Sequence, residues 1–225
     1  MIAKTNAIVI STLKYGETSL IVKCYTEKFG VQSYIINGVR SKSRKNKISF
    51  FQPLTQLELV VYHKENSSLK RITEYKSLYT YQNIFIEHEK ILVSFFLQEV
   101  LSKVLREEQA NSSLFSFITT SFLIFDNLPS KSPNFHIQFL LKLLDFLGYS
   151  ITKMSSFWEH IMILVPNQQL NIHLDNLLNS DYDTLIKISN PERRELLRYI
   201  LKYYQLHYES FNHLTTLEIL KEILD

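Results

Sequence analysis

Residues 54–63, LTQLELVVYH, carry the clearest secondary-structure pattern in the chain. Apolar and polar side chains alternate there, so that each kind would lie on its own face of an extended strand. The apolar set is Leu57, Leu59 and Val61, and the polar set is Gln56, Glu58 and Tyr62. Alternation over this length predicts a β-strand with one buried face.

Similar short runs precede and follow this segment. They are rich in β-branched or alternating residues and lie at 7–13, 20–26, 31–36 and 69–79. Three of the four glycines, Gly16, Gly30 and Gly38, fall at the breaks, where a positive φ costs glycine little. Five short strands separated by turn residues predict a small barrel or a sandwich.

After about residue 82 the apolar spacing becomes helical. Helices are expected at 84–108, 112–125, 135–147, 190–211 and 216–224. Between 150 and 190 the pattern is weaker, and apolar runs at 160–165 and 171–174 suggest a hairpin. We therefore expect an α+β chain, with a barrel domain at 1–81 and a helical domain at 82–225.

Charge divides along the same line. The chain of 225 residues has a net charge of +3, but residues 1–80 carry 13 Lys and Arg against 5 Asp and Glu, and residues 81–225 carry 12 against 17. The first part is therefore +8 and the second −5. A cationic module joined to a mildly acidic one favours a polyanionic partner for the first part.

The basic residues concentrate in the segment 38–53, GVRSKSRKNKISFFQP, which lies between two predicted strands and holds no acidic residue. Lysine and arginine can follow phosphates, serine can donate to phosphate oxygens, and an aromatic ring can stack on a base. Of the two phenylalanines, one is expected to enter the core, so at most one can stack. The candidate DNA contacts are Arg40, Lys42, Ser43, Arg44, Lys45, Lys47 and Phe51. A merely solvated loop is the alternative.

Catalytic patterns are missing from the sequence. It contains no phosphate-binding glycine loop, no dinucleotide fingerprint and no histidine pair at metal-ligand spacing. Cys24 is the only cysteine, which excludes an intrachain disulfide and a cysteine-rich zinc site. We expect a protein that is not an enzyme and has no cofactor or metal. With no signal peptide or membrane span in the pattern, we expect a cytoplasmic location.

Several segments resemble the RecO family of recombination mediators. In the first part they are Tyr15-Gly16-Glu17, Thr26-Glu27 with Gly30, Gly38-Val39-Arg40 followed by basic residues and Ser43, and Gln52-Pro53-Leu54. In the second part they are the leucine-rich segment 139–149, which ends in Leu-Gly-Tyr, and the segments 194–207 and 214–220.

The resemblance implies an OB-fold followed by a helical domain. It also implies binding to single- and double-stranded DNA, annealing of complementary strands, and nucleoid association in a bacterial cell. The implied partners are RecR and the acidic C-terminal tail of single-stranded-DNA-binding protein, and the implied outcome is loading of RecA onto covered strands. The alternative is an OB-fold adaptor that binds acidic peptides without DNA, and a metal-dependent nuclease is a weaker reading.

The sequence departs from the family at 150–159, SITKMSSFWE, where many members carry a four-cysteine zinc motif. The zinc is therefore not expected here. Phe157, Trp158, Ile161 and Ile163 are candidates to hold this region by packing instead.

A groove for the acidic tail would need a cation beside apolar helices. Arg194, Arg198 and Lys202 are spaced four apart, and we expect them to form one stripe on the C-terminal helix. The alternative is a solvated face that pairs with Glu192 and Glu195.

Overall fold

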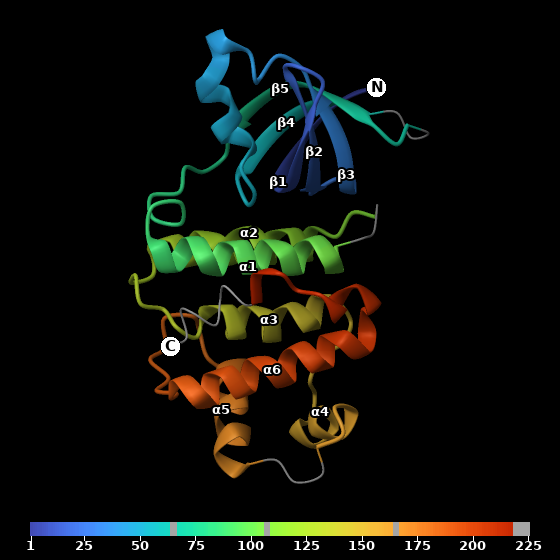
Figure 1. Ribbon diagram of the computed structural model, residues 1–225. Coiled ribbons are helices and arrows are strands. Elements are labelled where there is room, and N and C mark those ends of the chain that lie inside the picture. Colours follow the sequence, from blue (N-terminus) through green and yellow to red (C-terminus); the bar gives the residue numbers. More distant parts are fainter. Residues whose placement is uncertain (64–66, 106–108, 164–166, 218–225) are drawn as a thin grey trace. The chain divides into compact units, whose positions relative to one another are not determined.

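The computed structural model describes residues 1–63, 67–105, 109–163 and 167–217. The chain forms two compact units, one of Met1–Tyr81 with Val104–Thr119, the other of Gln82–Lys103 with Thr120–Asp225. The division at residues 81 and 82 stays a prediction, and the compact unit around the barrel also includes residues 104–119. Figure 1 shows the strands in the first unit and most of the helices in the second.

The first unit is built on a closed five-stranded barrel with the strand order β1-β2-β3-β5-β4. The strands are β1 (Ile2–Tyr15), β2 (Ser19–Thr26), β3 (Gly30–Ile36), β4 (Gln56–Tyr62) and β5 (Lys70–Ser77). Neighbouring strands are antiparallel except β3 and β5, which are parallel. The expected α+β class with an N-terminal OB-type barrel is confirmed, and the open choice between barrel and sandwich is settled.

Strand β1 closes the barrel because it pairs on both sides. Residues 2–8 pair with β4 and residues 7–15 pair with β2, and the β1–β2 register shifts between Val9 and Ser11. Such a bulge bends a strand and increases its twist, which lets one long strand serve both neighbours.

The alternation at 54–63 is confirmed. Leu57, Leu59 and Val61 are fully buried in the barrel core, and on the outward face Tyr62 is 51% exposed and Glu58 is partly exposed. Gln56 on that face is buried, because its amide donates to the carbonyl of Thr119. The core is completed by inward residues of the other strands, including Val9, Val22, Cys24, Tyr34 and Ile72.

One outer side of the barrel is covered within its own unit by residues 104–119, which include the first half of α2 (Ser112–Asn127). The ring of Tyr25 lies 6.1 Å from that of Phe115, and its hydroxyl donates to the carbonyl of Asn111 at 3.3 Å. The Gln56 amide donates to the carbonyl of Thr119 at 3.0 Å. Tyr25 is consequently buried although it points out of the barrel.

The second unit is helical. Its elements are α1 (His88–Val104), the rest of α2, α3 (Phe135–Phe146), α4 (Met154–His160), α5 (Gln168–Asn179), α6 (Asn190–His207) and the short 3₁₀ helix η2 (Glu209–Asn212). The expected start of α6 is confirmed by a capping box between Ser189 and Glu192 with proline in the first turn. Of the helix expected at 216–224, residues 218–224 lie outside the described residues.

The expected hairpin at 160–165 and 171–174 is wrong, because both segments belong to a helical region. Residue 160 ends α4 and residues 171–174 lie within α5, whereas 164–166 lie outside the described residues. Asn167 caps α5 by accepting from the backbone N–H of Gln169 at 2.9 Å. The capped amphipathic segment therefore forms a helix, although its apolar and β-branched residues suggested a strand.

Aromatic packing holds α4 against α6. The Phe157 ring lies 5.2 Å from Tyr203, and the Trp158 ring lies 5.4 Å from Tyr199. The Trp158 indole also donates to the side chain of Asn171 on α5 at 2.9 Å. Phe157, Trp158 and Ile161 are buried, as expected for a region held by packing. No described helix is long and apolar enough to cross a membrane.

Candidate nucleic-acid interface

The basic segment forms a 3₁₀ helix, η1 (Lys42–Phe51), between β3 and β4. In Figure 1 it is the light-blue helical segment outside the barrel. Val39 on one side of it and Phe51 at its end are both in the barrel core. The segment is therefore fixed to the barrel at each end, which a freely solvated loop would not be.

Arg40 fixes the entry to η1. Its backbone N–H donates to the carbonyl of Thr18 at 3.0 Å, and its guanidinium donates to the carbonyl of Gly16 at 3.0 Å. Both acceptors belong to the turn between β1 and β2. Arg40 thus carries its charge beside this turn and connects the turn to the basic segment.

The side chains of residues 42–46 lie outside the described residues, so the predictions for Lys42, Ser43, Arg44 and Lys45 stay predictions. Lys47 is exposed, as is its neighbour Ile48. Among the described carboxylates, none is paired with Lys47, and binding of an anionic ligand by this side chain stays a prediction.

Phe51 requires a correction. Its ring is 1% exposed and lies 4.8 Å from the ring of Tyr75 on β5. A side chain buried in the barrel core has no face to offer a base, so Phe51 serves as an anchor of η1 and not as a stacking platform. Phe50 is partly buried and lies 5.4 Å from the same tyrosine.

Sequence reasoning missed two cations on the open side of the barrel, Lys23 on β2 and Arg71 on β5. Both alternate with buried residues, since Val22 and Cys24 flank Lys23, and Lys70 and Ile72 flank Arg71. Among the described residues, no carboxylate pairs with either one. The alternation itself was the available signal, because a polar residue between two core positions must point outward.

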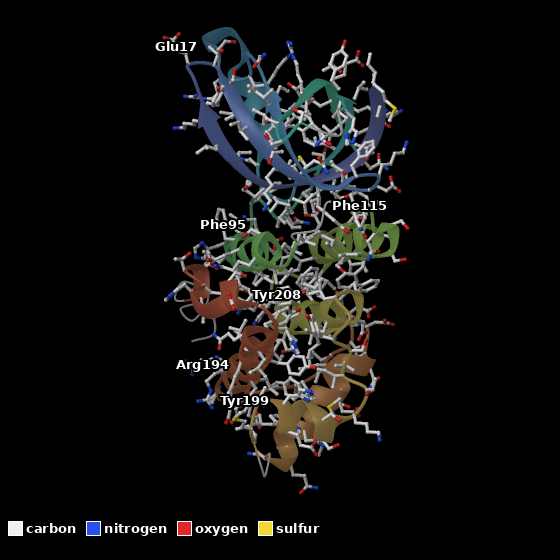
Figure 2. All side chains as sticks on the ribbon, turned by 90° about the vertical axis from the view of Figure 1, so that its right-hand side faces the viewer. Glu17, Phe95, Phe115, Arg194, Tyr199 and Tyr208 are labelled. Carbon is white, nitrogen blue, oxygen red and sulfur yellow. The ribbon has the colours of Figure 1, made fainter. Side chains whose placement is uncertain are left out.

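The acidic residues of the barrel leave this charge largely uncompensated. Glu58 accepts ion pairs from Lys4 at 2.8 Å and Lys76 at 2.9 Å, and these hydrogen bonds hold the pKa of its carboxyl below the ordinary value. Glu27 accepts from the Asn6 amide. Glu17 lies in the turn between β1 and β2, at the tip of that hairpin (Figure 2).

The three cations proposed for the partner tail differ in their surroundings. The guanidinium of Arg198 lies 3.5 Å from the Glu195 carboxylate, measured from Nη2 to Oε1. Its Cζ lies 5.0 Å from the centroid of the Tyr199 ring. Lys202 donates to the carbonyl of Ile161 at 2.6 Å and so supports the end of α4. Arg194 is partly buried, and Figure 2 shows it with Tyr199 at the outer side of the helical unit. Peptide binding by this set stays a prediction.

The described residues contain no group of three or more His, Cys, Asp or Glu side chains that could hold a metal ion. Cys24 is buried in the barrel, and burial raises the pKa of its thiol to about 12. The thiol is therefore protonated at neutral pH and is a poor nucleophile.

Comparison with known proteins agrees with this architecture. Residues 1–81 match the family model described as Recombination protein O N terminal, and residues 88–156 match Recombination protein O C terminal. The curated proteins named DNA repair protein RecO from Christiangramia forsetii and Flavobacterium psychrophilum are 34% and 35% identical, over 99% and 98% of each chain. The one from Bacteroides fragilis is 33% identical over 100% of each chain.

The barrel and the helical unit define a class of two-part proteins with a cationic OB-type module. The full-length matches then make the assignment specific: the chain belongs to the RecO family of DNA repair proteins.

Proposed function

We propose that this protein is a non-enzymatic recombination mediator that binds and anneals single-stranded DNA. With RecR, it helps to load RecA onto strands covered by single-stranded-DNA-binding protein during repair of gaps and double-strand breaks. The observation that carries the proposal is the basic segment in η1, which is anchored by Arg40 and Phe51 on a barrel of net positive charge. Membership of the RecO family supports the repair role.

Annealing requires no catalytic group. Two complementary strands repel each other through their phosphates, and lysine and arginine side chains reduce that repulsion by displacing counterions. A cluster of cations held on a folded surface can bring both strands close while their bases pair. This agrees with a site made of cations, in which the buried Cys24 thiol has no chemical part.

The proposed partners are single- and double-stranded DNA, RecR and the acidic tail of single-stranded-DNA-binding protein. For the tail, we propose the α6 face that carries Arg194, Arg198 and Lys202. Within the protein, Arg198 also pairs with Glu195, and Lys202 donates to the Ile161 carbonyl. An acidic peptide with apolar end residues would match cations next to the partly exposed ring of Tyr199.

An annealing assay with two complementary oligonucleotides tests the central claim, run with and without single-stranded-DNA-binding protein. Changing Lys42, Arg44, Lys45 and Lys47 to alanine is expected to slow annealing and to weaken binding to any sequence. The slope of log affinity against log salt for a single strand should fall by up to about three, because each lost phosphate contact removes roughly 0.7.

A matched control changes Lys28, Lys131, Lys153 and Lys187 to alanine, which removes the same charge from exposed positions elsewhere. Equal loss in both variants would show that net charge, and not η1, governs binding. The adaptor alternative predicts a different result, namely that the unaltered protein binds an acidic peptide at low salt and binds no oligonucleotide.

A further inference from the structure

The strand register places six outward-facing side chains in one row around the barrel, which we call the apolar row. In spatial order they are Leu13, Ile21, Ile35, Arg71, Tyr62 and Ile2. Each is the direct cross-strand partner of the next, on β1, β2, β3, β5, β4 and again β1. Neighbouring strands lie about 4.8 Å apart, so these side chains form a continuous surface.

The apolar row faces outward and is accessible. Leu13, Tyr62 and Ile2 are 65%, 51% and 62% exposed, while Ile21 and Ile35 are partly exposed. Their sequence neighbours Val22, Tyr34 and Val61 are buried in the core, which fixes the direction of the row. Apolar residues that are exposed singly are common, but a contiguous apolar surface in contact with water is typical of interaction sites.

Cations surround this surface. Arg71 lies in the row itself, and Lys23 lies in the next row along the strands, opposite Ser33. Tyr15 is 51% exposed two residues beyond Leu13, and Arg40 donates to the adjacent Gly16. The row therefore begins beside the basic segment.

Among the described residues, one carboxylate lies in the rows that adjoin the apolar row, and Glu17 lies farther out in the turn between β1 and β2. Glu74 is the cross-strand partner of Val60, so it lies on the β4–β5 side, next to the positions of Tyr62 and Arg71. The adjoining rows over β1, β2 and β3 consist of Ser11, Lys23 and Ser33 on one side and Tyr15, Ser19 and Asn37 on the other. This excess of positive charge beside an apolar surface favours an anionic ligand with apolar parts.

We propose that the apolar row receives the unstacked bases of a single DNA strand, with Tyr62 and Arg71 as its stacking pair and Lys23 and Arg40 beside the phosphates. This rests on the proposed DNA-binding function and adds the element that distinguishes single strands from duplex. Phenol rings and guanidinium planes stack on bases of any sequence. In a duplex the bases are already stacked inside, so the duplex can use the cations but not the row. From Leu13 to Arg71 the row spans three strand spacings, about 14 Å.

The test compares the variants Tyr62→Ala and Arg71→Gln with the unaltered protein. Fluorescence anisotropy would measure the Kd for a labelled single strand and for a duplex of the same sequence at one salt concentration. We expect Tyr62→Ala to weaken single-strand binding by roughly 5- to 100-fold, the usual loss for one stacked base. Duplex binding and the salt slope should stay unchanged. Arg71→Gln should also weaken single-strand binding and should lower the salt slope.

Two exposed positions away from the row provide controls. Leu78→Ala removes an exposed apolar side chain, and Lys28→Gln removes one positive charge, and both should leave the single-strand preference unchanged. Circular dichroism of each variant would verify the fold.

If the unaltered protein binds both DNA forms and Tyr62→Ala binds them as tightly as the unaltered protein does, the apolar row is not the base contact and the proposed function survives. If Tyr62→Ala instead only changes self-association in sedimentation, the row is an interface between copies and the proposal is wrong. If the unaltered protein binds neither form, the proposed function itself fails.

Discussion

The ammonium of Lys90 donates to the backbone carbonyl of Asp126 at 2.9 Å. The carboxylate of the same Asp126 accepts from the backbone N–H groups of Gln82, Asn83 and Ile84, at 2.8 to 2.9 Å. Both side chains are buried. The segment that leads into α1 is thereby fastened to the end of α2, within the helical unit.

Replacement of this carboxylate should be costly. Asp126→Asn leaves one acceptor oxygen for three backbone donors, of which the N–H of Ile84 is buried, so we expect a loss of about 2 kcal/mol in the free energy of unfolding. Urea denaturation followed by circular dichroism would measure it. Asp183→Asn on the exposed surface is the control and should change stability by less than about 0.5 kcal/mol. Equal midpoints for the two variants would contradict this role.

Glu99 should make the C-terminal segment sensitive to acid. Partial burial alone would raise the pKa of its carboxyl, but hydrogen bonds from the side chains and backbone of Thr216 and Thr215 outweigh it and hold the pKa below 4.5. These contacts are complete above the ordinary pKa and are lost as the pH falls through the lower folded-state pKa.

Limited proteolysis near residues 215–217 would detect this loss. Cleavage by an acid-active protease should increase as the pH falls below about 4.5, and Glu99→Gln should show increased cleavage already at neutral pH. Glu89→Gln, at a partly exposed position of the same helix, should behave like the unaltered protein. A pH profile that is the same with and without the Glu99 carboxylate would refute the assignment.

Phe51 should matter for stability and not for base contact. Phe51→Ala should cost about 3–5 kcal/mol of unfolding free energy, as for other buried phenylalanines. Phe51→Leu retains most of the volume, so it should remain folded and bind single strands with an unchanged Kd. A clear loss of affinity in a folded Phe51→Leu protein would restore the stacking role that its burial argues against.

Stability should not depend on zinc. The region 149–163 is held by Phe157, Trp158 and their partners on α5 and α6, so a chelator is expected to leave the Tm unchanged. Phe157→Ala should lower the Tm by several degrees, since it removes a ring buried against Tyr203. A drop in Tm upon chelation, reversed by added zinc, would show that another ligand set exists.

The barrel was predictable because its strands alternate clearly, as 54–63 does, and because helical spacing replaces that pattern after residue 82. The region 160–174 was not, since short apolar runs have no decisive period. In the structure, the Asn167 cap begins α5, and a hydrogen bond from Trp158 to Asn171 holds α5 against α4.

The site was predictable in part. The segment 38–53 stands out by its charge, but the choice between Phe50 and Phe51 depends on where η1 rejoins the barrel. Lys23 and Arg71 are too far apart in sequence to appear as a cluster, and only the β3–β5 pairing brings their strands onto one surface.

The bulge in β1 has a consequence for how other molecules can approach the barrel. Because it lets β1 pair with β4 through residues 2–8 and with β2 through residues 7–15, strands β2 and β4 each have a neighbour on either side. A partner peptide therefore cannot extend the sheet along them by main-chain hydrogen bonds, as many peptide-binding domains allow. A partner must therefore bind these strands by contacts with their side chains, and each such contact can be tested by a single substitution.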